Sequence, residues 1–87
     1  MDREELKKKL QDMLAVVDED VAKSVQITDE TEIREGLGLD SLQIVELLFE
    51  IEEQLEVKIE DEEAQRLRTV GNLLDVIEQK MEAAGGE

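Results

Sequence analysis

The side chains that could take part in covalent chemistry are few in this sequence. The chain has 87 residues with no histidine and no cysteine, and its only serines are Ser24 and Ser41. Without an imidazole base, neither serine can belong to a histidine-based nucleophilic triad, and the usual ligands of zinc and copper are missing as well. We therefore expect a protein that is not itself an enzyme and that holds no metal ion.

Ser41 has the more unusual surroundings of the two serines. It follows Asp40 at the predicted start of a helix, and Gly36 and Gly38 come just before it. A phosphate ester on its hydroxyl would lie where helix N–H groups tolerate negative charge, and the glycines would let another protein's active site approach closely. The alternative is that Ser41 merely begins a helix, as many serines do. On local chemistry alone, this plainer interpretation has the advantage.

Negative charge dominates the composition. Acidic side chains outnumber basic ones by 25 to 10, which gives a formal net charge of −15. Between Glu35 and Val57 there are seven acidic residues and no lysine or arginine. This stretch is either a solvated helix face or a surface that steers a basic protein toward Ser41. The charge argues against binding to nucleic acid or to an anionic membrane, and its self-repulsion favours a monomer.

The spacing of apolar residues predicts the elements that position Ser41. It predicts helices over about residues 3–17, from the Asp40 cap to about 55, over 61–67 and, after a Thr69 cap, over about 70–81. Between the first and second helices, residues 18–39 are expected to form a long packed loop with room for one helical turn. The fold class is therefore all-α, a small four-helix bundle with three longer helices and one short helix. Residues 1–82 form its domain, and residues 83–87 a flexible tail.

Three apolar residues lie beside the acidic stripe of the second predicted helix. Leu42, Val45 and Phe49 are spaced i, i+3 and i+7, so they share one face of that helix. They are either exposed for contact with a partner or packed in the core. The sequence alone favours core packing.

The sequence contains no segment expected to enter or cross a membrane. The chain begins Met1-Asp2-Arg3-Glu4-Glu5 and continues into an amphipathic stretch, and no apolar run approaches the ~20 residues that a span needs. We therefore expect no signal peptide, no membrane span and a cytoplasmic location.

Several short motifs together resemble those of the acyl carrier proteins. The resemblance begins at Gly38-Leu39-Asp40-Ser41-Leu42 and continues through Val45-Glu46-Leu47, Glu52-Glu53, Val57-Lys58-Ile59, Asp61-Glu62-Glu63-Ala64 and Thr69-Val70-Gly71. It covers essentially the whole chain in length, element order and acidity, and it implies that residues 1–82 form an acyl carrier domain.

The resemblance implies a covalent cofactor on Ser41. This residue would carry a 4′-phosphopantetheine arm, attached by a phosphopantetheinyl transferase that uses coenzyme A. The arm would supply the thiol that the chain lacks and would hold acyl groups as thioesters for fatty acid or related lipid biosynthesis. Acyl-loading, elongating and transferring enzymes with basic patches would contact the residues that match the family's partner surface. These are Asp40, Glu46, Glu52 and Glu53 for charge, and Leu42, Val45 and Phe49 for apolar contact.

Departures from the commonest family pattern leave alternatives open. Gln43 stands where the fatty acid members usually have an acid, Phe49 where they often have methionine, and Glu60 where proline is common; Arg66 and Arg68 are also atypical. A dedicated carrier for a polyketide or a cell-envelope lipid is therefore one alternative. A second alternative, of another class, is an acidic helical module that binds a basic protein and is never modified.

Overall fold

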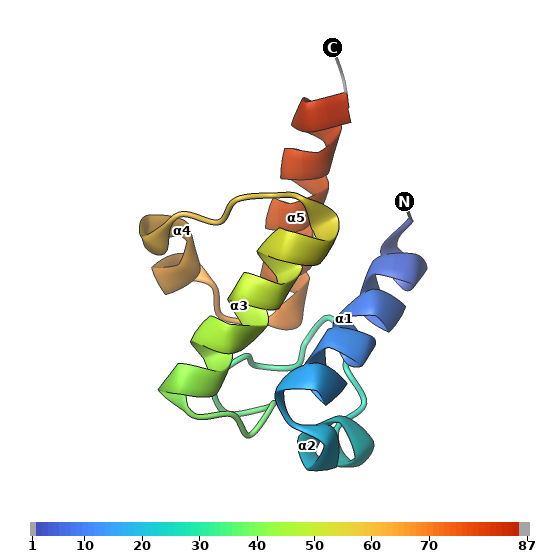
Figure 1. The fold of residues 1–87 in the computed structure, drawn as a ribbon, viewed down its shortest axis with the longest axis vertical. Helices are drawn as coiled ribbons and strands as arrows, with labels where there is room; N and C mark the ends of the chain where they lie inside the picture. The colour runs from blue at the N-terminus through green and yellow to red at the C-terminus, as the bar shows by residue number, and fades with distance from the viewer. Residues whose placement is uncertain (1, 86–87) are drawn as a thin grey trace.

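The computed structural model describes residues 2–85, and the side chains of residues 2–82. Over this part of the chain the fold consists of five helices and no strand, arranged as in Figure 1. They are α1 (Arg3–Val17), α2 (Glu19–Ser24), α3 (Ser41–Leu55), α4 (Asp61–Arg66) and α5 (Val70–Gly85). The predicted all-α class is confirmed. Of the predicted tail over 83–87, residues 86–87 and the side chains of 83–85 lie outside the described residues, and the α5 backbone reaches Gly85.

The predicted count of four helices is wrong because the first connection contains α2. Asp18 caps this helix, since its carboxylate accepts a hydrogen bond from the backbone N–H of Val21 at 3.2 Å. Glu19 and Asp20 occupy the first turn and Lys23 the last, which suits the helix dipole. None of its six residues is fully buried, and only Val21 and Ala22 pack against the core, which is too short an apolar face for periodicity to reveal.

Two apolar stripes of the sequence, on α1 and α5, supply much of the core. On α1 the buried residues are Leu6, Leu10, Met13 and Leu14, and on α5 they include Val70, Leu73, Leu74 and Ile77. Both sets have helical spacing, and Leu47 and Ile51 of α3 are buried with them. Each buried leucine contributes about 1.5–3 kcal/mol relative to an exposed one. The core is therefore aliphatic, and its helical part comes from α1, α3 and α5.

The loop between α2 and α3 is anchored rather than free. Ile27, Ile33, Leu37 and Leu39 are buried in the same core. The backbone N–H of Ile33 donates to the carbonyl of Arg68 at 2.9 Å, and Glu32 and Thr69 form an isolated antiparallel bridge. These contacts hold the segment before Ser41 against the turn between α4 and α5.

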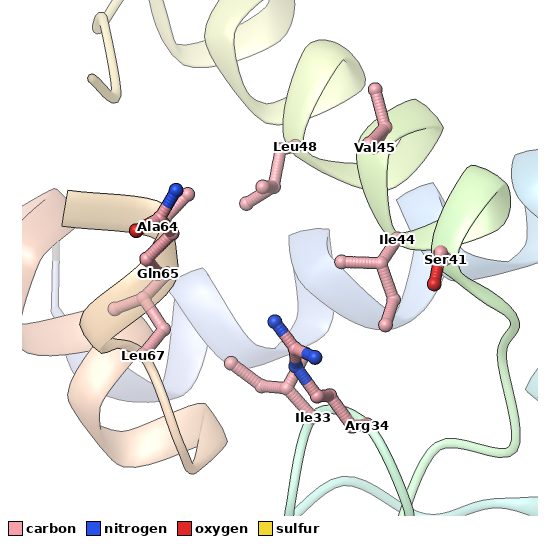
Figure 2. Close-up of a pocket in the computed structure, with 9 residues that line it drawn as sticks. All are labelled: Ile33, Arg34, Ser41, Ile44, Val45, Leu48, Ala64, Gln65 and Leu67. Carbon is pink, nitrogen blue, oxygen red and sulfur yellow. The ribbon is translucent and has the colours of Figure 1, made fainter. Parts of the chain in front are cut away.

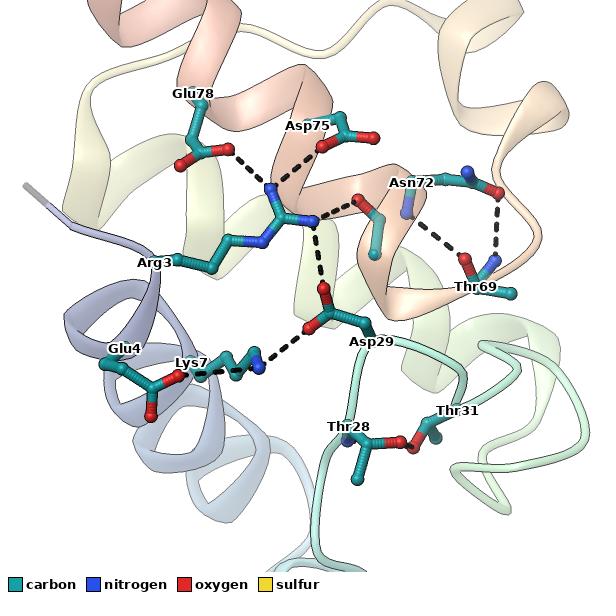
Figure 3. A network of polar contacts seen from close by, with 11 residues as sticks. Arg3, Glu4, Lys7, Thr28, Asp29, Thr31, Thr69, Asn72, Asp75 and Glu78 are labelled. Atoms are coloured by element: carbon teal, nitrogen blue, oxygen red, sulfur yellow. Dashed lines mark hydrogen bonds and ion pairs between the residues drawn. The ribbon is translucent and has the colours of Figure 1, made fainter.

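A network of ion pairs joins α1 to α5 and to the loop (Figure 3). The Arg3 guanidinium pairs with Asp29 of the loop and with Asp75 and Glu78 of α5. The Lys7 ammonium lies 2.7 Å from the buried Oδ1 of Asp29. The contact with Lys7, followed by that with Arg3, holds the pKa of Asp29 below its usual range. The network thus links α1, the loop and α5 to one another.

No helix of the described region could span a bilayer. Between residues 2 and 85, none combines the length and the apolar character that crossing a membrane requires.

Candidate functional site

Ser41 is the first residue of α3, and a reciprocal cap fixes its position. The carboxylate of Asp40 accepts from the backbone N–H of Gln43 at 2.8 Å, and the Gln43 side-chain oxygen accepts from the backbone N–H of Asp40 at 3.2 Å. This is the capping box that the sequence predicts. Ser41 itself is exposed. Its hydroxyl is thus held at a rigid helix start where other molecules can reach it.

The side-chain amide of Gln43 also joins two elements. Its Nε2 donates to Oδ2 of Asp18, the α2 cap, at 3.0 Å. This hydrogen bond, more than any other contact, holds the pKa of Asp18 below its usual range. The first turn of α3 is therefore linked to the start of α2. Sequence reasoning identified the capping role of Gln43 but missed this bond, because Asp18 lies 25 positions away.

The glycines before Ser41 have backbone roles of their own. Gly38 adopts a left-handed conformation with φ +71° between the buried side chains of Leu37 and Leu39. Gly36 lies against Glu32, where a Cβ would come within 2.6 Å of the Glu32 carbonyl oxygen. Both positions therefore favour glycine for reasons internal to the loop.

A cavity of about 180 Å³ opens beside Ser41, between α3 and α4 (Figure 2). From α3 it is lined by Ser41, Ile44, Val45 and Leu48. The remaining lining residues are Ala64, Gln65 and Leu67 on the α4 side, and Ile33 and Arg34 from the loop. Most of these side chains are apolar, so the cavity suits a hydrocarbon chain better than a polar ligand. The presence of Arg34 in this lining could not be predicted from the sequence pattern.

The predicted partner-contact residues lie mostly on the outer face of α3. Leu42, Val45 and Phe49 are 69%, 61% and 63% exposed, so the expectation that they pack in the core is wrong. The buried residues Leu47 and Ile51 occupy the other side of the helix and satisfy the core without them. The result is an exposed apolar stripe on a helix of an otherwise highly charged protein.

Acidic residues border this stripe. Asp40, Glu46 and Glu53 are exposed, and the period of the helix places Glu46 and Glu53 on the face of Leu42 and Phe49. Glu52 differs from them because it is half-buried and its carboxylate accepts from the backbone N–H of Ile59 at 2.8 Å. It lies at the flank of the stripe and holds the loop after α3.

Comparison with known proteins identifies the family. Residues 4–77 match the family model described as a phosphopantetheine attachment site. The chain belongs to the acyl carrier protein family. Members of this family carry a covalently bound 4′-phosphopantetheine group and serve as carriers rather than as catalysts.

Three relatives agree with this membership. The chain is similar to the acyl carrier proteins of an Exiguobacterium species (38% identity over 73 residues, 83% of this chain and 92% of the relative) and of Rubrobacter xylanophilus (41% over 80 residues, 88% and 93%). It is also similar to that of Helicobacter pylori, at 41% identity over 69 residues, covering 78% of this chain and 88% of the relative. The likeness therefore extends over nearly the whole length of each carrier.

The residues around Ser41 suit the chemistry of this prosthetic group. An exposed hydroxyl can take up a phosphopantetheinyl group from coenzyme A, forming a phosphodiester without any buried group being displaced, and the first turn of α3 favours negative charge there. The neighbouring cavity is apolar, as an acyl chain requires. The thiol of such a group would provide thioester chemistry in a chain that has no cysteine.

Proposed function

We propose that this acyl carrier protein holds acyl intermediates as thioesters on a 4′-phosphopantetheine arm attached to Ser41, for fatty acid or related lipid biosynthesis. The observation that carries the proposal is the exposed Ser41 hydroxyl, at a capped helix start and on the lining of an apolar cavity. Of the two serines, Ser24 has no such setting, since its hydroxyl donates to the Asp20 carbonyl within α2. Ser41 is thus the serine that is both exposed to a modifying enzyme and next to a cavity that could hold an acyl group.

In this proposal the cavity between α3 and α4 shelters the acyl group. Ile44 and Leu48 of α3 face it from one side, and Leu67 lies on its opposite side (Figure 2). Contact with these side chains removes hydrocarbon from water, at about 25 cal/mol for each Å² of apolar surface buried. Excluding water also protects a thioester from hydrolysis.

The outer face of α3 is the proposed contact surface for partner enzymes. Asp40, Glu46 and Glu53 would meet lysine and arginine side chains, and Leu42, Val45 and Phe49 would supply the apolar contact. Glu52 would add charge at the flank of this surface. Exposed charges mainly raise the rate of encounter, whereas buried apolar side chains supply most of the binding energy. A phosphopantetheinyl transferase and the acyl-loading, elongating and transferring enzymes are the proposed partners.

A dedicated carrier for a polyketide or a cell-envelope lipid is the second candidate. It is favoured by Gln43, whose amide donates to Asp18 where an acidic side chain would repel it, and by the large exposed ring of Phe49. Both residues lie on α3 next to the proposed attachment site. Partners of the commonest fatty acid carriers would therefore meet an altered surface at these two positions.

The mass of the intact protein after enzymatic modification tests the proposal. The apo protein, coenzyme A and a broad-specificity phosphopantetheinyl transferase are incubated together, with Ser41→Ala and the matched control Ser24→Ala alongside. The wild type and Ser24→Ala are expected to gain one phosphopantetheinyl group, and Ser41→Ala none. A folded apo protein that gains no mass would contradict the proposal and would leave the unmodified acidic module as the better interpretation.

The cargo is tested on the modified protein. An acyl group loaded onto it should be released by neutral hydroxylamine, as a thioester is. Elongation of that group by fatty acid synthesis enzymes would support the fatty acid assignment. Loading without any elongation by those enzymes would favour the dedicated carrier.

A further inference from the structure

Arg34 is the one basic side chain that lines the cavity beside Ser41. Figure 2 shows its guanidinium reaching into the space that Ile44 and Leu67 also border. Among the residues that the structure describes, no acidic side chain forms an ion pair with Arg34, and the same holds for Arg66 and Arg68; its place on the lining beside Ser41 is what distinguishes Arg34. Arg34 is exposed, borders a mainly apolar lining and has no protein counter-ion among the described residues, so its charge is available to a ligand.

The backbone that carries Arg34 is fixed. Its neighbour Ile33 is buried, and the Ile33 N–H donates to the Arg68 carbonyl at 2.9 Å. This bond forms part of the bridge between Glu32 and Thr69, which the Val70 N–H completes by donating to the Thr31 carbonyl at 2.8 Å. Arg34 is therefore anchored beside the cavity and not carried on a freely moving loop.

The charged side chains that follow Arg34 in the sequence around Ser41 are acidic, so Arg34 is a positive charge at the edge of a negative region. The stretch from Glu35 to Val57 holds seven acidic residues and no basic residue, and Asp40 is the immediate neighbour of Ser41. A phosphodiester on Ser41 would add a further negative charge to this region. Arg34 also borders an adjoining cavity of about 410 Å³, together with Glu32, Glu35 and Arg68, but neither glutamate pairs with it among the described residues.

We propose that Arg34 binds the phosphodiester that joins the arm to Ser41 and so directs the arm over the cavity between α3 and α4. This inference rests on the proposed function. A guanidinium presents several N–H donors in a planar fork that matches the oxygens of a phosphate group. Neutralising the phosphodiester would also offset its repulsion from Asp40. A carboxylate at the end of an acyl cargo has related chemistry, and the test separates the two sources.

The side-chain Nε–Hε resonances of the arginines report this contact directly. Spectra of the ¹⁵N-labelled protein are recorded before and after modification with coenzyme A and the transferase, and the mass of each sample is measured. On gaining the arm without cargo, the Arg34 resonance should shift clearly, while those of Arg66 and Arg68 should stay in place. At about 1 M salt, where the Debye length is about 3 Å, the shift should diminish.

Variants provide a second readout. In Arg34→Gln the transverse relaxation of the ³¹P resonance of the arm should be slower than in the wild type, because the phosphodiester becomes more mobile. Arg34→Lys keeps the positive charge, so its ³¹P transverse relaxation rate should lie between those of Arg34→Gln and the wild type. The matched control Arg68→Gln should have the same rate as the wild type.

The outcomes separate this inference from the proposed function. Absence of a mass gain would overturn both together. A full mass gain with an unmoved Arg34 resonance would overturn the Arg34 inference alone. A shift that occurs only after a malonyl group is loaded, and not with an acetyl group, would also overturn it and would assign Arg34 to the cargo carboxylate.

Discussion

The residues that precede Ser41 determine how its hydroxyl is presented. Leu37 and Leu39 are buried on either side of Gly38, so the loop is fixed two residues before the attachment site. Gly36 lies in contact with the Glu32 backbone, while Gly38 faces open space and uses the freedom of φ that glycine provides. One glycine is thus required by space and the other by conformation.

Alanine substitutions should distinguish these two requirements. In Gly36→Ala the new Cβ would meet the backbone of Glu32 at 2.6–2.7 Å, which forces the loop to shift and costs about 1–3 kcal/mol. Gly38→Ala should cost about 1 kcal/mol from its positive φ alone, and Gly38→Asn less. Thermal unfolding followed by circular dichroism ranks the variants, because each kcal/mol of lost stability lowers the unfolding midpoint by about 4–8 °C. Equal or greater loss in Gly38→Ala would show that the Gly36 contact is unimportant.

Features of single residues that depend only on their neighbours in sequence could be predicted from the sequence. The Asp40 cap and the position of Ser41 follow from side chains within three residues of each other, so local rules suffice. The exposure of Leu42, Val45 and Phe49 could not be predicted in the same way. An apolar residue on a helix that is apolar over most of its surface looks the same whether the neighbouring helix covers it or not.

Among the elements, α2 and α3 are joined at their first turns. Asp18 caps α2 and accepts from Gln43, which completes the cap of α3. The carboxylate of Asp18 is favoured in its charged form by these hydrogen bonds. The orientation of α2 is therefore tied to the helix start that presents Ser41.

Replacing Gln43 by glutamate should break this link. Gln43→Glu retains a capping-box acceptor for Asp40 but places a second carboxylate against Asp18. The pKa of Asp18 should return toward or above its ordinary value, because the donor is lost and a like charge is added. NMR titration measures the pKa, and thermal unfolding should show a lower midpoint than in the wild type.

Two further variants separate the causes. Gln43→Met removes the donor without adding charge, so it should raise the pKa of Asp18 less than Gln43→Glu does. Gln26→Glu adds the same charge at an exposed loop position and should leave the pKa of Asp18 unchanged. An unaltered Asp18 pKa in Gln43→Glu would contradict the observed link.

The elements that periodicity predicts are those with a buried face. The helices α1 and α5 have apolar residues at i, i+3, i+4 and i+7, because each packs on the core along its length. By contrast, α2 has no buried residue, and only the Asp18 cap and the flanking charges marked it in the sequence. A bridge such as Glu32 to Thr69 joins residues too far apart in sequence for a local pattern to reveal.

For the whole molecule, the balance of charge determines how stability depends on pH. The net charge is −15 and the sequence pI is about 4.2, so the acidic side chains of the folded protein repel one another at neutral pH. The ion pairs of Arg3 and Lys7 oppose this repulsion locally by joining α1 to the loop and α5 (Figure 3). Acidification therefore acts on stability in two opposite directions.

Thermal stability should pass through a maximum at about pH 5. From pH 7 downward, loss of net charge relieves self-repulsion and raises the midpoint. The pKa values of Asp18, Asp29 and Glu63 are lowered, chiefly by Gln43, Lys7 and Lys80 in turn. A carboxylate with a lowered folded-state pKa adds stability above its unfolded pKa and loses it as the pH falls through the folded value. The midpoint should therefore decline below about pH 4, the ordinary range of these groups.

High salt tests the predicted rise of the unfolding midpoint between pH 7 and pH 5, and one variant tests its decline at acid pH. High salt should flatten the rise between pH 7 and pH 5 by screening the repulsion. Lys80→Gln removes the ammonium that lies 2.8 Å from Glu63, so the decline at acid pH should become shallower. A midpoint that falls steadily from pH 7 downward would contradict this account of the charge balance.

Peptide mapping of the modified protein tests the central claim most directly. Trypsin cleaves after Lys23, Arg34 and Lys58, and the peptide of residues 35–58 contains Ser41 as its single hydroxyl side chain, whereas Ser24 falls in the peptide of residues 24–34. The proposed function predicts that, after treatment with coenzyme A and the transferase, the 35–58 peptide alone gains the mass of one phosphopantetheinyl group. That mass on the 24–34 peptide, or on none, would contradict it.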